Sequence, residues 1–302
     1  MNIEKTILIP TYENFSFEEC IWFLNRNYDD CLHSVSKTGI IKAIQINNEV
    51  YLISLKEKIK SIEVEILNNN FNEETKNLIV SYVKDWLDVE RDIKPFYDLL
   101  KQNEKLAYMV EEYKGLRLIG IEDLFETLCW SIIGQQINLT FAYKLKRRLV
   151  EKFGTAIEFN GEVYHIFPSC EVLSSITIEE LREMQFSKQK AEYIIGSAKA
   201  FFSKELSKEK IKALPDFISK HKALTNIKGI GVWTANYALM KSLRESQAIP
   251  FGDVGLLNAL KNHEIINERS ETEKIKELFK KFAGWESYLV IYLWRSLPEM
   301  KN

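Results

Sequence analysis

The chain has 302 residues and a mass of 35.4 kDa, beyond the roughly 250 to 300 residues at which one hydrophobic core stops growing, so we expect two packed units. Hydrophobic residues make up 46% and charged residues 28%, with only 12 glycines and 6 prolines, which excludes a disordered or collagen-like chain. No stretch approaches the ~20 apolar residues of a membrane span, and no signal peptide precedes the first element, so we expect a soluble, cytoplasmic protein.

The net charge of −2 conceals two parts of opposite sign. Residues 1–90 hold 9 Lys and Arg against 15 Asp and Glu, a net charge of −6, whereas the remaining 212 residues hold 32 against 28, a net charge of +4. A polyanion would therefore bind the second part, and only locally, because so small an excess is no general polycation.

Cysteine and histidine patterns favour neither a disulfide framework nor a metal site. The four histidines show no HExxH or HxE spacing, and the cysteines are too far apart for a CxxC motif. The cysteines are Cys20, Cys31, Cys129 and Cys170. We expect them to be reduced thiols in an intracellular protein.

The first 92 residues are predicted to form an antiparallel sheet with flanking helices. Strands are expected over residues 5–10, 40–46, 50–55 and 61–67, and helices over 16–26 and 71–87. Asn47 and Asn48 are typical of a hairpin turn, and Ser16 with Glu19 fits a capping box. The charged segment 90–95, which ends in a proline, indicates a boundary between an N-terminal domain, 1–92, and a second domain, 93–302.

Helical periodicity dominates the second domain, which we therefore expect to be all-α. About nine helices are predicted, at residues 121–133, 141–152, 177–184, 189–202, 216–224, 232–244, 254–262, 271–280 and 286–296.

The segment 224–237, LTNIKGIGVWTANY, carries two glycines between two helical patterns. Gly229 and Gly231 allow a tight turn, and the next helix begins at once, so its free N–H groups and positive dipole end would suit a phosphate. A plain connection between two helices explains the glycines equally well.

Asp253 follows a proline and a glycine and stands directly before a predicted helix. An N-cap is the commonest role for an aspartate at such a place, and a carboxylate aimed into a cleft between helices is the alternative. The two roles are compatible.

The segment 124–153 joins an apolar helix to a basic helix through Gly134, Gln135 and Gln136. The basic helix is typical of a solvated surface. A glutamine in the connecting loop that enters a base stack as a polar wedge is the alternative.

Together these segments resemble the helix-hairpin-helix DNA glycosylases, and within them the DNA-3-methyladenine glycosylase II branch. The likeness covers about residues 90–302, through the SIIGQQ and KGIGVWTANY motifs, a Pro-x-x-Asp sequence before a helix, and a closing helix from Trp285 to Trp294. It implies an α+β fold whose helical domain forms two sub-bundles with a cleft between them. It also implies double-stranded DNA as the partner of a monomer.

Two departures from the wider family narrow the expected activity. Glycosylases that also cut the strand carry a lysine where this chain has Trp233, so we expect direct hydrolysis, without a covalent intermediate or a lyase step. The branch with an iron–sulfur cluster has four closely spaced C-terminal cysteines, whereas no cysteine follows Cys170, so we expect no cluster.

The resemblance implies that Asp253 is the catalytic anion and that Trp233, Tyr237 and Trp294 surround the base pocket. Trp233 and Tyr237 share one helix face at i and i+4. Aromatic ring faces attract cations, which favours positively charged purines such as 3-methyladenine and 7-methylguanine. A second aromatic group is instead predicted to be core: Trp285, Tyr288 and Tyr292.

The resemblance also implies the DNA contacts. Lys228, Gly229 and Gly231 would hold the DNA backbone at the hairpin. Backbone carbonyls of Thr225, Ile227 and Gly229 would bind a monovalent cation, Na⁺ or K⁺, when DNA is present. Gln136 matches the wedge position best, with Gln135 close behind, although the branch usually has leucine there.

The resulting hypothesis is a monofunctional glycosylase of base excision repair that flips alkylated purines out of duplex DNA and leaves an abasic site. Two alternatives stay open: an oxidised-purine glycosylase of the same fold, and a catalytically silent DNA-binding module. The missing lysine argues against the first, and Asp253 argues against the second.

Overall fold

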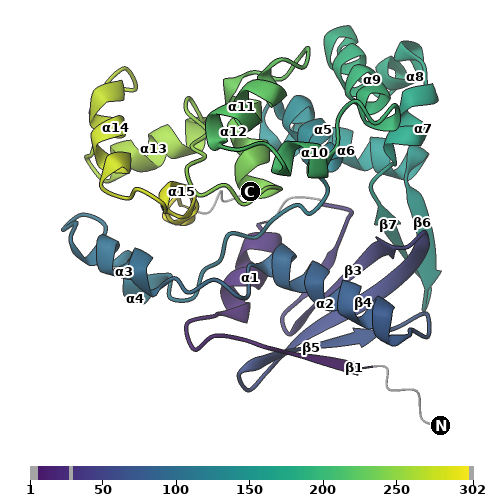
Figure 1. Ribbon diagram of the computed structural model, residues 1–302, viewed down its shortest axis with the longest axis horizontal. Coiled ribbons are helices and arrows are strands. Elements are labelled where there is room, and N and C mark those ends of the chain that lie inside the picture. The colour runs from purple at the N-terminus through teal and green to yellow at the C-terminus, as the bar shows by residue number, and fades with distance from the viewer. Residues whose placement is uncertain (1–5, 27–29, 299–302) are drawn as a thin grey trace.

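A five-stranded antiparallel sheet forms the N-terminal part of the computed structural model, which describes residues 6–26 and 30–298 (Figure 1). The strands lie in the order β1-β5-β4-β3-β2. Their bounds are β1 Thr6–Pro10, β2 Ser34–Ser36, β3 Gly39–Ile46, β4 Glu49–Lys58 and β5 Ser61–Ile66. The predicted sheet is confirmed, while β2 is too short for alternation to reveal it. The predicted start of the first strand, Lys5, lies outside the described residues.

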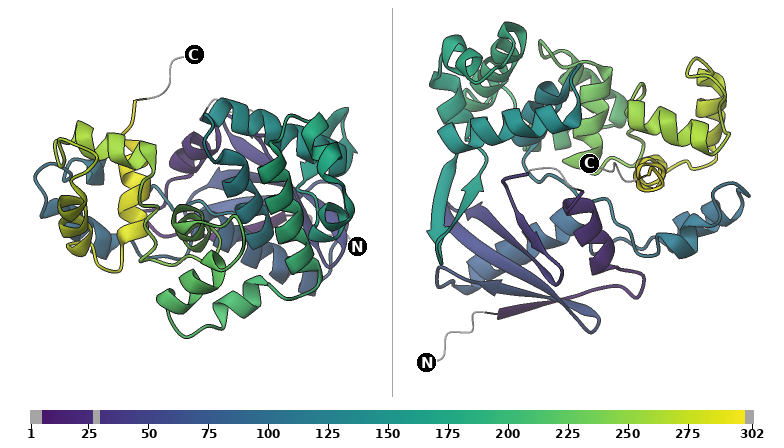
Figure 2. Two further views of the ribbon diagram at one scale, coloured as in Figure 1. Left: turned by 90° about the horizontal axis from the view of Figure 1, so that it is seen from above. Right: turned by 180° about the vertical axis from the view of Figure 1, so that it is seen from behind.

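The sheet and two helices share one hydrophobic core. In β5, the side chains of Ile62, Val64 and Ile66 are fully buried, as period-2 alternation predicts. Helix α2 (Glu73–Leu87) packs along one face of the sheet, and α1 (Phe17–Leu24) lies beside it (Figures 1 and 2). The turn between β3 and β4 uses two left-handed residues, Asn47 and Asn48, with φ of 49° and 66°.

Helices make up most of the rest of the described chain. The longer ones are α5 Leu124–Gly134, α6 Leu139–Phe153, α9 Lys188–Phe202, α11 Phe217–Thr225, α12 Val232–Lys241, α13 Val254–Asn262, α14 Thr272–Lys280 and α15 Glu286–Arg295. The shorter ones are α3 Lys94–Lys101, α4 Met109–Glu112, α7 Cys170–Ser175, α8 Ile178–Glu183 and α10 Lys208–Lys212. The sequence pattern missed α3, α4, α7 and α10, each of eight residues or fewer, although it predicted the equally short α1 and α8.

The prediction of an all-α second domain is wrong in one place. Residues Thr155–Phe159 and Glu162–Ile166 form a two-stranded hairpin, β6 and β7, and β7 lies against β3 of the sheet (Figure 1). Its turn is Asn160–Gly161, with φ of 52° and 82°. Asn-Gly between alternating apolar residues is a strong hairpin signal, which outweighs the weak helical period of this segment.

The helices form two groups, as expected. Helices α5 to α12 lie on one side, and α13 to α15 lie on the other together with α3 and α4 (Figures 1 and 2). One hydrophobic core runs through both groups. Among the described residues, no helix has both the length and the apolar composition that crossing a membrane requires.

Buried polar contacts join the N-terminal sheet domain to the helices. Arg295 pairs with Glu19 at 2.8 Å, and the Tyr288 hydroxyl donates to Asp88 at 2.5 Å. Lys146 contacts both carboxylate oxygens of Asp30 at 3.1 Å. The N-terminal domain is therefore fixed against the helical domain close to the residues predicted to act on DNA.

Candidate active site

Asp253 stands at the N-terminus of α13, where its side chain combines both predicted roles. Its Oδ1 accepts the backbone N–H of Leu256 at 2.7 Å, so the side chain caps the helix. The same oxygen accepts the indole N–H of Trp294 at 2.9 Å, and Oδ2 accepts the indole N–H of Trp233 at 3.3 Å. Three donors from α13, α15 and α12 thus hold a half-buried carboxylate in one orientation.

Gly255 makes this arrangement possible, and the sequence pattern did not single it out. A Cβ atom at this position would lie 3.1 Å from Oδ1 of Asp253 and 3.4 Å from Nε1 of Trp294. The missing side chain leaves room for the indole to reach the carboxylate. A glycine in the first turn of a predicted helix is less stable than alanine there, so its presence could have indicated a packing requirement.

Three aromatic side chains gather beside Asp253, and they are the three predicted for the base pocket. The rings of Trp233 and Tyr237 stack with centroids 5.3 Å apart and planes 20° apart. The ring of Tyr237 lies 6.4 Å from that of Trp294. The structure therefore brings together the four residues that the family resemblance implied, from three helices.

Trp130 also belongs to this aromatic group. The sequence pattern predicts only an apolar helix here and gives Trp130 no role. Its indole N–H donates to the Tyr237 hydroxyl at 3.2 Å, and its ring lies 4.6 Å from that of Tyr143. In a run of apolar residues, the sequence pattern does not distinguish a tryptophan that lies next to the site from one in the core. The other aromatic stripe is core as predicted: Trp285 stacks on Phe96, and Tyr288 and Tyr292 are buried.

Glycine is suited to the two positions of the hairpin between α11 and α12 for different physical reasons. Gly229 has a φ of 92°, and a Cβ there would lie 2.3 Å from the ring of Tyr193. Gly231 is the N-cap of α12 and has no side chain to cap it, so the first N–H groups of that helix have no capping side chain among the described residues. Lys228 is exposed beside them. Both the tight turn and an open helix terminus are present.

The two candidate wedge residues occupy different environments. The amide of Gln135 donates to the carbonyl of Gly229 at 3.1 Å and contacts Oγ1 of Thr234 at 3.3 Å. Gln136 is exposed and has a left-handed backbone, with a φ of 57°. Gln135 therefore ties the loop to the hairpin, and Gln136 is the residue available to an external partner.

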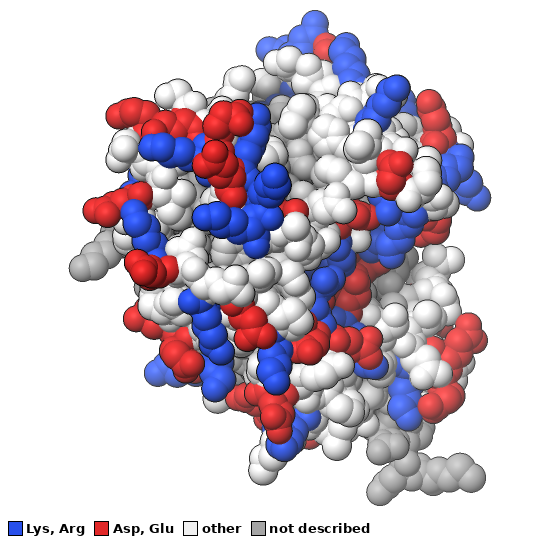
Figure 3. Space-filling view, turned by 60° about the vertical axis from the view of Figure 1, so that its left-hand side comes forward, with Lys and Arg blue, Asp and Glu red and all other residues white. Residues whose placement is uncertain are grey.

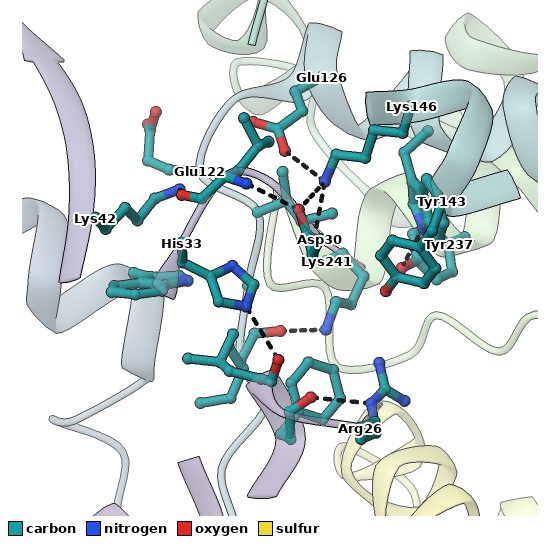
Figure 4. Close-up of a pocket in the computed structure, with 18 of the residues that line it drawn as sticks. Arg26, Asp30, His33, Lys42, Glu122, Glu126, Tyr143, Lys146, Tyr237 and Lys241 are labelled. Atoms are coloured by element: carbon teal, nitrogen blue, oxygen red, sulfur yellow. Dashed lines mark hydrogen bonds and ion pairs between the residues drawn. The ribbon is translucent and has the colours of Figure 1, made fainter. Parts of the chain in front are cut away.

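A pocket between the two domains lies beyond Tyr237, and no sequence motif indicated it (Figure 4). We call it the interdomain pocket; its volume is about 80 Å³. Its ionisable side chains come from both domains: Arg26, Asp30, His33, Lys42, Glu122, Glu126, Lys146 and Lys241. The aromatic residues Trp130, Tyr143 and Tyr237 complete one wall. The sequence could not reveal it because these charges are scattered along the chain.

A buried ion pair dominates one side of the interdomain pocket. Burial alone would raise the pKa of Asp30, but the Lys146 ammonium holds that pKa well below its ordinary value. Burial likewise opposes the charge of Lys146, but Asp30 and Glu126 raise its pKa above the ordinary value. Both groups are therefore charged, and each satisfies the other.

Two further basic side chains, Lys241 and Arg26, line the pocket, and neither has a carboxylate partner among the described residues. Lys241 is buried; its ammonium donates to the carbonyl of Ile119 and lies 4.3 Å from the centre of the Phe23 ring. Burial, reinforced by Arg26 and Arg244, lowers the pKa of Lys241 well below its ordinary value. Arg26 donates through Nε to the carbonyl of Phe23 at 2.9 Å.

One face of the molecule carries charges of both signs rather than a broad basic patch. On the face shown in Figure 3, basic and acidic side chains are interspersed over the described residues.

Comparison with known proteins identifies similar chains over nearly the full length. A sequence model of the HhH-GPD superfamily of base excision DNA repair proteins matches residues 129–284, and one of the 8-oxoguanine DNA glycosylase N-terminal domain matches residues 25–128. A DNA-3-methyladenine glycosylase of Bacillus subtilis (strain 168) is 38% identical over 302 residues, which cover 98% of each chain.

Two solved structures have a similar fold. A 3-methyladenine DNA-glycosylase from Archaeoglobus fulgidus aligns with a TM-score of 0.83 and 24% identity, over 96% of this chain and 97% of the other. An 8-oxoguanine glycosylase/lyase from Clostridium acetobutylicum, solved with double-stranded DNA, aligns with a TM-score of 0.77 and 20% identity, over 96% and 94%.

Proposed function

This chain belongs to the HhH-GPD superfamily of base excision DNA repair proteins, and from that membership we propose that it is a monofunctional DNA glycosylase for alkylated purines. It flips a base such as 3-methyladenine or 7-methylguanine out of duplex DNA, hydrolyses the N-glycosidic bond and leaves an abasic site. We further propose that it acts as a monomer in the cytoplasm. The observation that carries the proposal is the Asp253 carboxylate, held by two indoles beside a group of aromatic rings.

Asp253 acts on the sugar. A cationic base is already a good leaving group, so bond cleavage needs little acid catalysis but leaves an oxocarbenium-like sugar that an anion stabilises. Oδ1 already accepts two hydrogen bonds, whereas Oδ2 accepts one from Trp233 and keeps an acceptor site. Oδ2 therefore faces the sugar and orients the attacking water.

The aromatic residues select the base. Trp233, Tyr237 and Trp294 present ring faces next to the carboxylate, and a ring face attracts a cation by up to about 2 kcal/mol in a desolvated site. Stacking of about 1 to 3 kcal/mol per base also offsets part of the cost of extrusion. A neutral, undamaged base gains the stacking but not the attraction between charge and ring.

The hairpin holds the DNA backbone. The open N-terminus of α12 at Gly231, the backbone at Gly229 and the exposed Lys228 bind phosphate oxygens. Gln136 enters the space that the flipped base leaves, and Gln135 fixes the loop that carries it.

A monovalent cation fits the donor set at the hairpin. Thr225, Ile227 and Gly229 line one surface hollow, and carbonyl oxygens are the ligands that hard cations prefer. The Ile227 and Gly229 carbonyls each accept one hydrogen bond, which leaves each a second lone pair. Na⁺ or K⁺ bound there would supply positive charge to a DNA phosphate.

The oxidised-purine glycosylase/lyase is the main competing function. Trp233 stands where the resemblance requires a nucleophilic lysine, and its indole is bonded to Asp253. No amine therefore adjoins the reacting sugar at this position, and hydrolysis is favoured. Borohydride trapping of a protein–DNA adduct would show that the lyase is the correct function.

The experiment is a single-turnover assay for abasic sites on duplexes that carry one 3-methyladenine or 7-methylguanine. Asp253→Asn should lose about 10² to 10³ in rate and remain folded, because asparagine also caps a helix. Asp216→Asn is the matched control: Asp216 caps α11 through Ser219 but lies outside the site, so its rate should not change. Equal rates for wild type and Asp253→Asn would refute the proposal.

A further inference from the structure

Lys190 is a buried cation beside the two loops that are proposed to hold DNA. Its side chain extends from α9 and is 9% exposed, and its ammonium donates to the backbone carbonyl of Ile133 at 2.7 Å. Burial lowers the pKa of Lys190 below its ordinary value, and no carboxylate among the described residues offsets that effect. A methionine of similar length would avoid the cost of burying a charge, so the lysine is explained by what its ammonium holds.

The carbonyl that Lys190 holds belongs to the last turn of α5. The last four carbonyls of a helix have no partner within the helix, and α5 has no basic residue of its own in that turn. Within the described chain, no backbone N–H outside α5 donates to the Ile133 carbonyl either. Lys190 therefore satisfies a buried acceptor and places a positive charge at the negative end of the α5 dipole.

Gln135 and Gln136, which we call the wedge loop, begin two residues after that carbonyl. Gln136 has a φ of 57°, a left-handed conformation that a residue other than glycine keeps only where its surroundings hold it. Gln135 ties the wedge loop to the hairpin through the carbonyl of Gly229. The hydrogen bond from Lys190 fixes the end of α5 from which the same loop starts.

Helix α9 supports the hairpin as well as α5, against which it packs (Figure 1). Tyr193 comes three residues after Lys190 and shares its helix face. The Tyr193 ring lies so close to Gly229 that a Cβ there would be 2.3 Å away. Lys190, Gln136 and Gly229 also line one surface hollow. One face of α9 therefore sets the position of the wedge loop relative to the hairpin.

We propose that Lys190 is a positioning residue for base extrusion, whose ammonium holds the end of α5 so that Gln136 stands where insertion into the base stack requires it. The inference rests on the proposed function and extends it to a residue outside the base pocket. The wedge and the contacts to the DNA backbone must act on the same base pair. A wedge loop that is free to shift therefore loses rate even when the DNA is still bound.

The test compares wild type, Lys190→Met and Lys190→Arg on a duplex with one 7-methylguanine beside 2-aminopurine. Lys190→Met leaves the Ile133 carbonyl without its donor, so the single-turnover rate at saturating protein should fall by about tenfold or more. The rise in 2-aminopurine fluorescence on binding should be smaller, while the Kd for the duplex changes little. Lys190→Arg keeps a charged donor and should lose less.

A second duplex carries the same lesion opposite an abasic-site analogue, so that the base is already unpaired. Less extrusion is required there, because an unpaired base costs less to move out of the stack. The rate loss of Lys190→Met should therefore be smaller on this duplex than on the paired one.

Lys208→Met is the matched control. Lys208 donates to the Glu122 carbonyl at 2.5 Å, just before the other end of α5. Both variants thus remove a lysine from a backbone carbonyl at an end of one helix, and both should lose stability in urea unfolding. Lys208→Met should nevertheless extrude and excise the base as wild type does, because the wedge loop keeps its support.

The salt dependence of binding separates positioning from a direct contact between Lys190 and a DNA phosphate. Loss of one phosphate contact lowers the slope of log K against log[salt] by about one, whereas Lys190→Met should keep the wild-type slope. A lower slope would make Lys190 a DNA ligand and overturn the inference. Wild-type extrusion by Lys190→Met, or equal losses on the paired and unpaired lesions, would also overturn it. A wild-type protein that excises neither lesion would overturn the proposed function and the inference with it.

Discussion

The indole nitrogen of Trp294 donates to Oδ1 of Asp253 at 2.9 Å, across the space between α15 and α13. The same oxygen caps α13, so one atom of the proposed catalytic carboxylate is engaged both by its own helix and by another. This geometry fixes the carboxylate before any DNA arrives. Preorganised charge of this kind needs little reorganisation when the positive sugar develops.

Trp294→Phe tests whether the hydrogen bond from Trp294 to the Asp253 carboxylate contributes to the reaction rate. Phenylalanine keeps an aromatic face but cannot donate, and one hydrogen bond to a charged group contributes about 1.5 to 3 kcal/mol. We expect kcat for 3-methyladenine to fall by about tenfold or more, with a smaller change in KM. Trp285→Phe is the control, because Trp285 stacks on Phe96 instead. Equal loss in the two variants would assign the effect to packing.

Trp233→Leu tests the contribution of the ring face to the recognition of cationic bases. Leucine is apolar but has no π-face, so excision of 3-methyladenine should fall more than excision of neutral hypoxanthine, with a ratio change of up to about thirtyfold. Trp233→Phe loses the hydrogen bond to Asp253 and keeps a ring. Its ratio should therefore stay closer to that of wild type. Parallel losses for both bases in Trp233→Leu would count against selection by charge.

Gly229→Ala should destabilise the hairpin, whereas Gly231→Ala should not. The new Cβ at Gly229 meets the ring of Tyr193 at 2.3 Å and adopts a φ of 92°, which strains any L-residue. At Gly231 the added Cβ has no heavy atom of the other described residues within 4 Å, its two chain neighbours aside, and φ is −84°. Urea unfolding should show a loss of about 1 to 3 kcal/mol for the first variant alone. Similar stabilities would contradict this account of the turn.

The local arrangement of several candidate-site residues could be predicted from the sequence, whereas their roles came from the family resemblance. Asp253 before a helix and Trp233 with Tyr237 at i and i+4 are patterns within one or two turns of a helix. Their order along the chain also carries the family resemblance, which supplied Trp294. The structure adds that the two indoles hold opposite oxygens of one carboxylate, a relationship between segments that no local pattern contains.

The interdomain pocket could not be predicted from the sequence. Asp30 and Lys146 lie far apart along the chain, and each would be read as an ordinary surface charge. Only the packing of the N-terminal domain on α6 and α12 buries them together. The negative charge of residues 1–90 indicated that this domain avoids DNA, but not that it supplies one wall of a pocket next to Tyr237.

Gln136→Ala should impair base extrusion without affecting the fold. The side chain is exposed, so the free energy of unfolding should change little, while kcat falls because nothing fills the space in the stack. Fluorescence of 2-aminopurine next to the lesion, which reports unstacking, should rise less on binding. Gln135→Ala should instead lower stability as well, because it leaves its hydrogen bond to Gly229 unmade. Full extrusion by Gln136→Ala would exclude it as the wedge.

Asp30→Asn should remove much of the acid sensitivity of folding. The pKa of Asp30 lies well below its ordinary value in the folded protein, so the folded state holds fewer protons than the unfolded state below about pH 4. Stability from the ion pair with Lys146 is therefore complete above that pH and is lost as the pH falls further. Urea unfolding of wild type between pH 2.5 and pH 7 should show this decline, and Asp30→Asn should show a flatter profile.

At neutral pH, the same variant leaves the buried Lys146 with Glu126, at 3.7 Å, as its one carboxylate partner among the described residues. We therefore expect the free energy of unfolding to fall by about 3 to 5 kcal/mol. Combining Asp30→Asn with Lys146→Met should recover a large part of that loss, because the uncompensated charge is gone. Asp98→Asn is the control: its pair with Lys101, at 3.9 Å, is exposed, so stability should barely change. Additive effects in the double variant would show that Asp30 and Lys146 do not act as a pair.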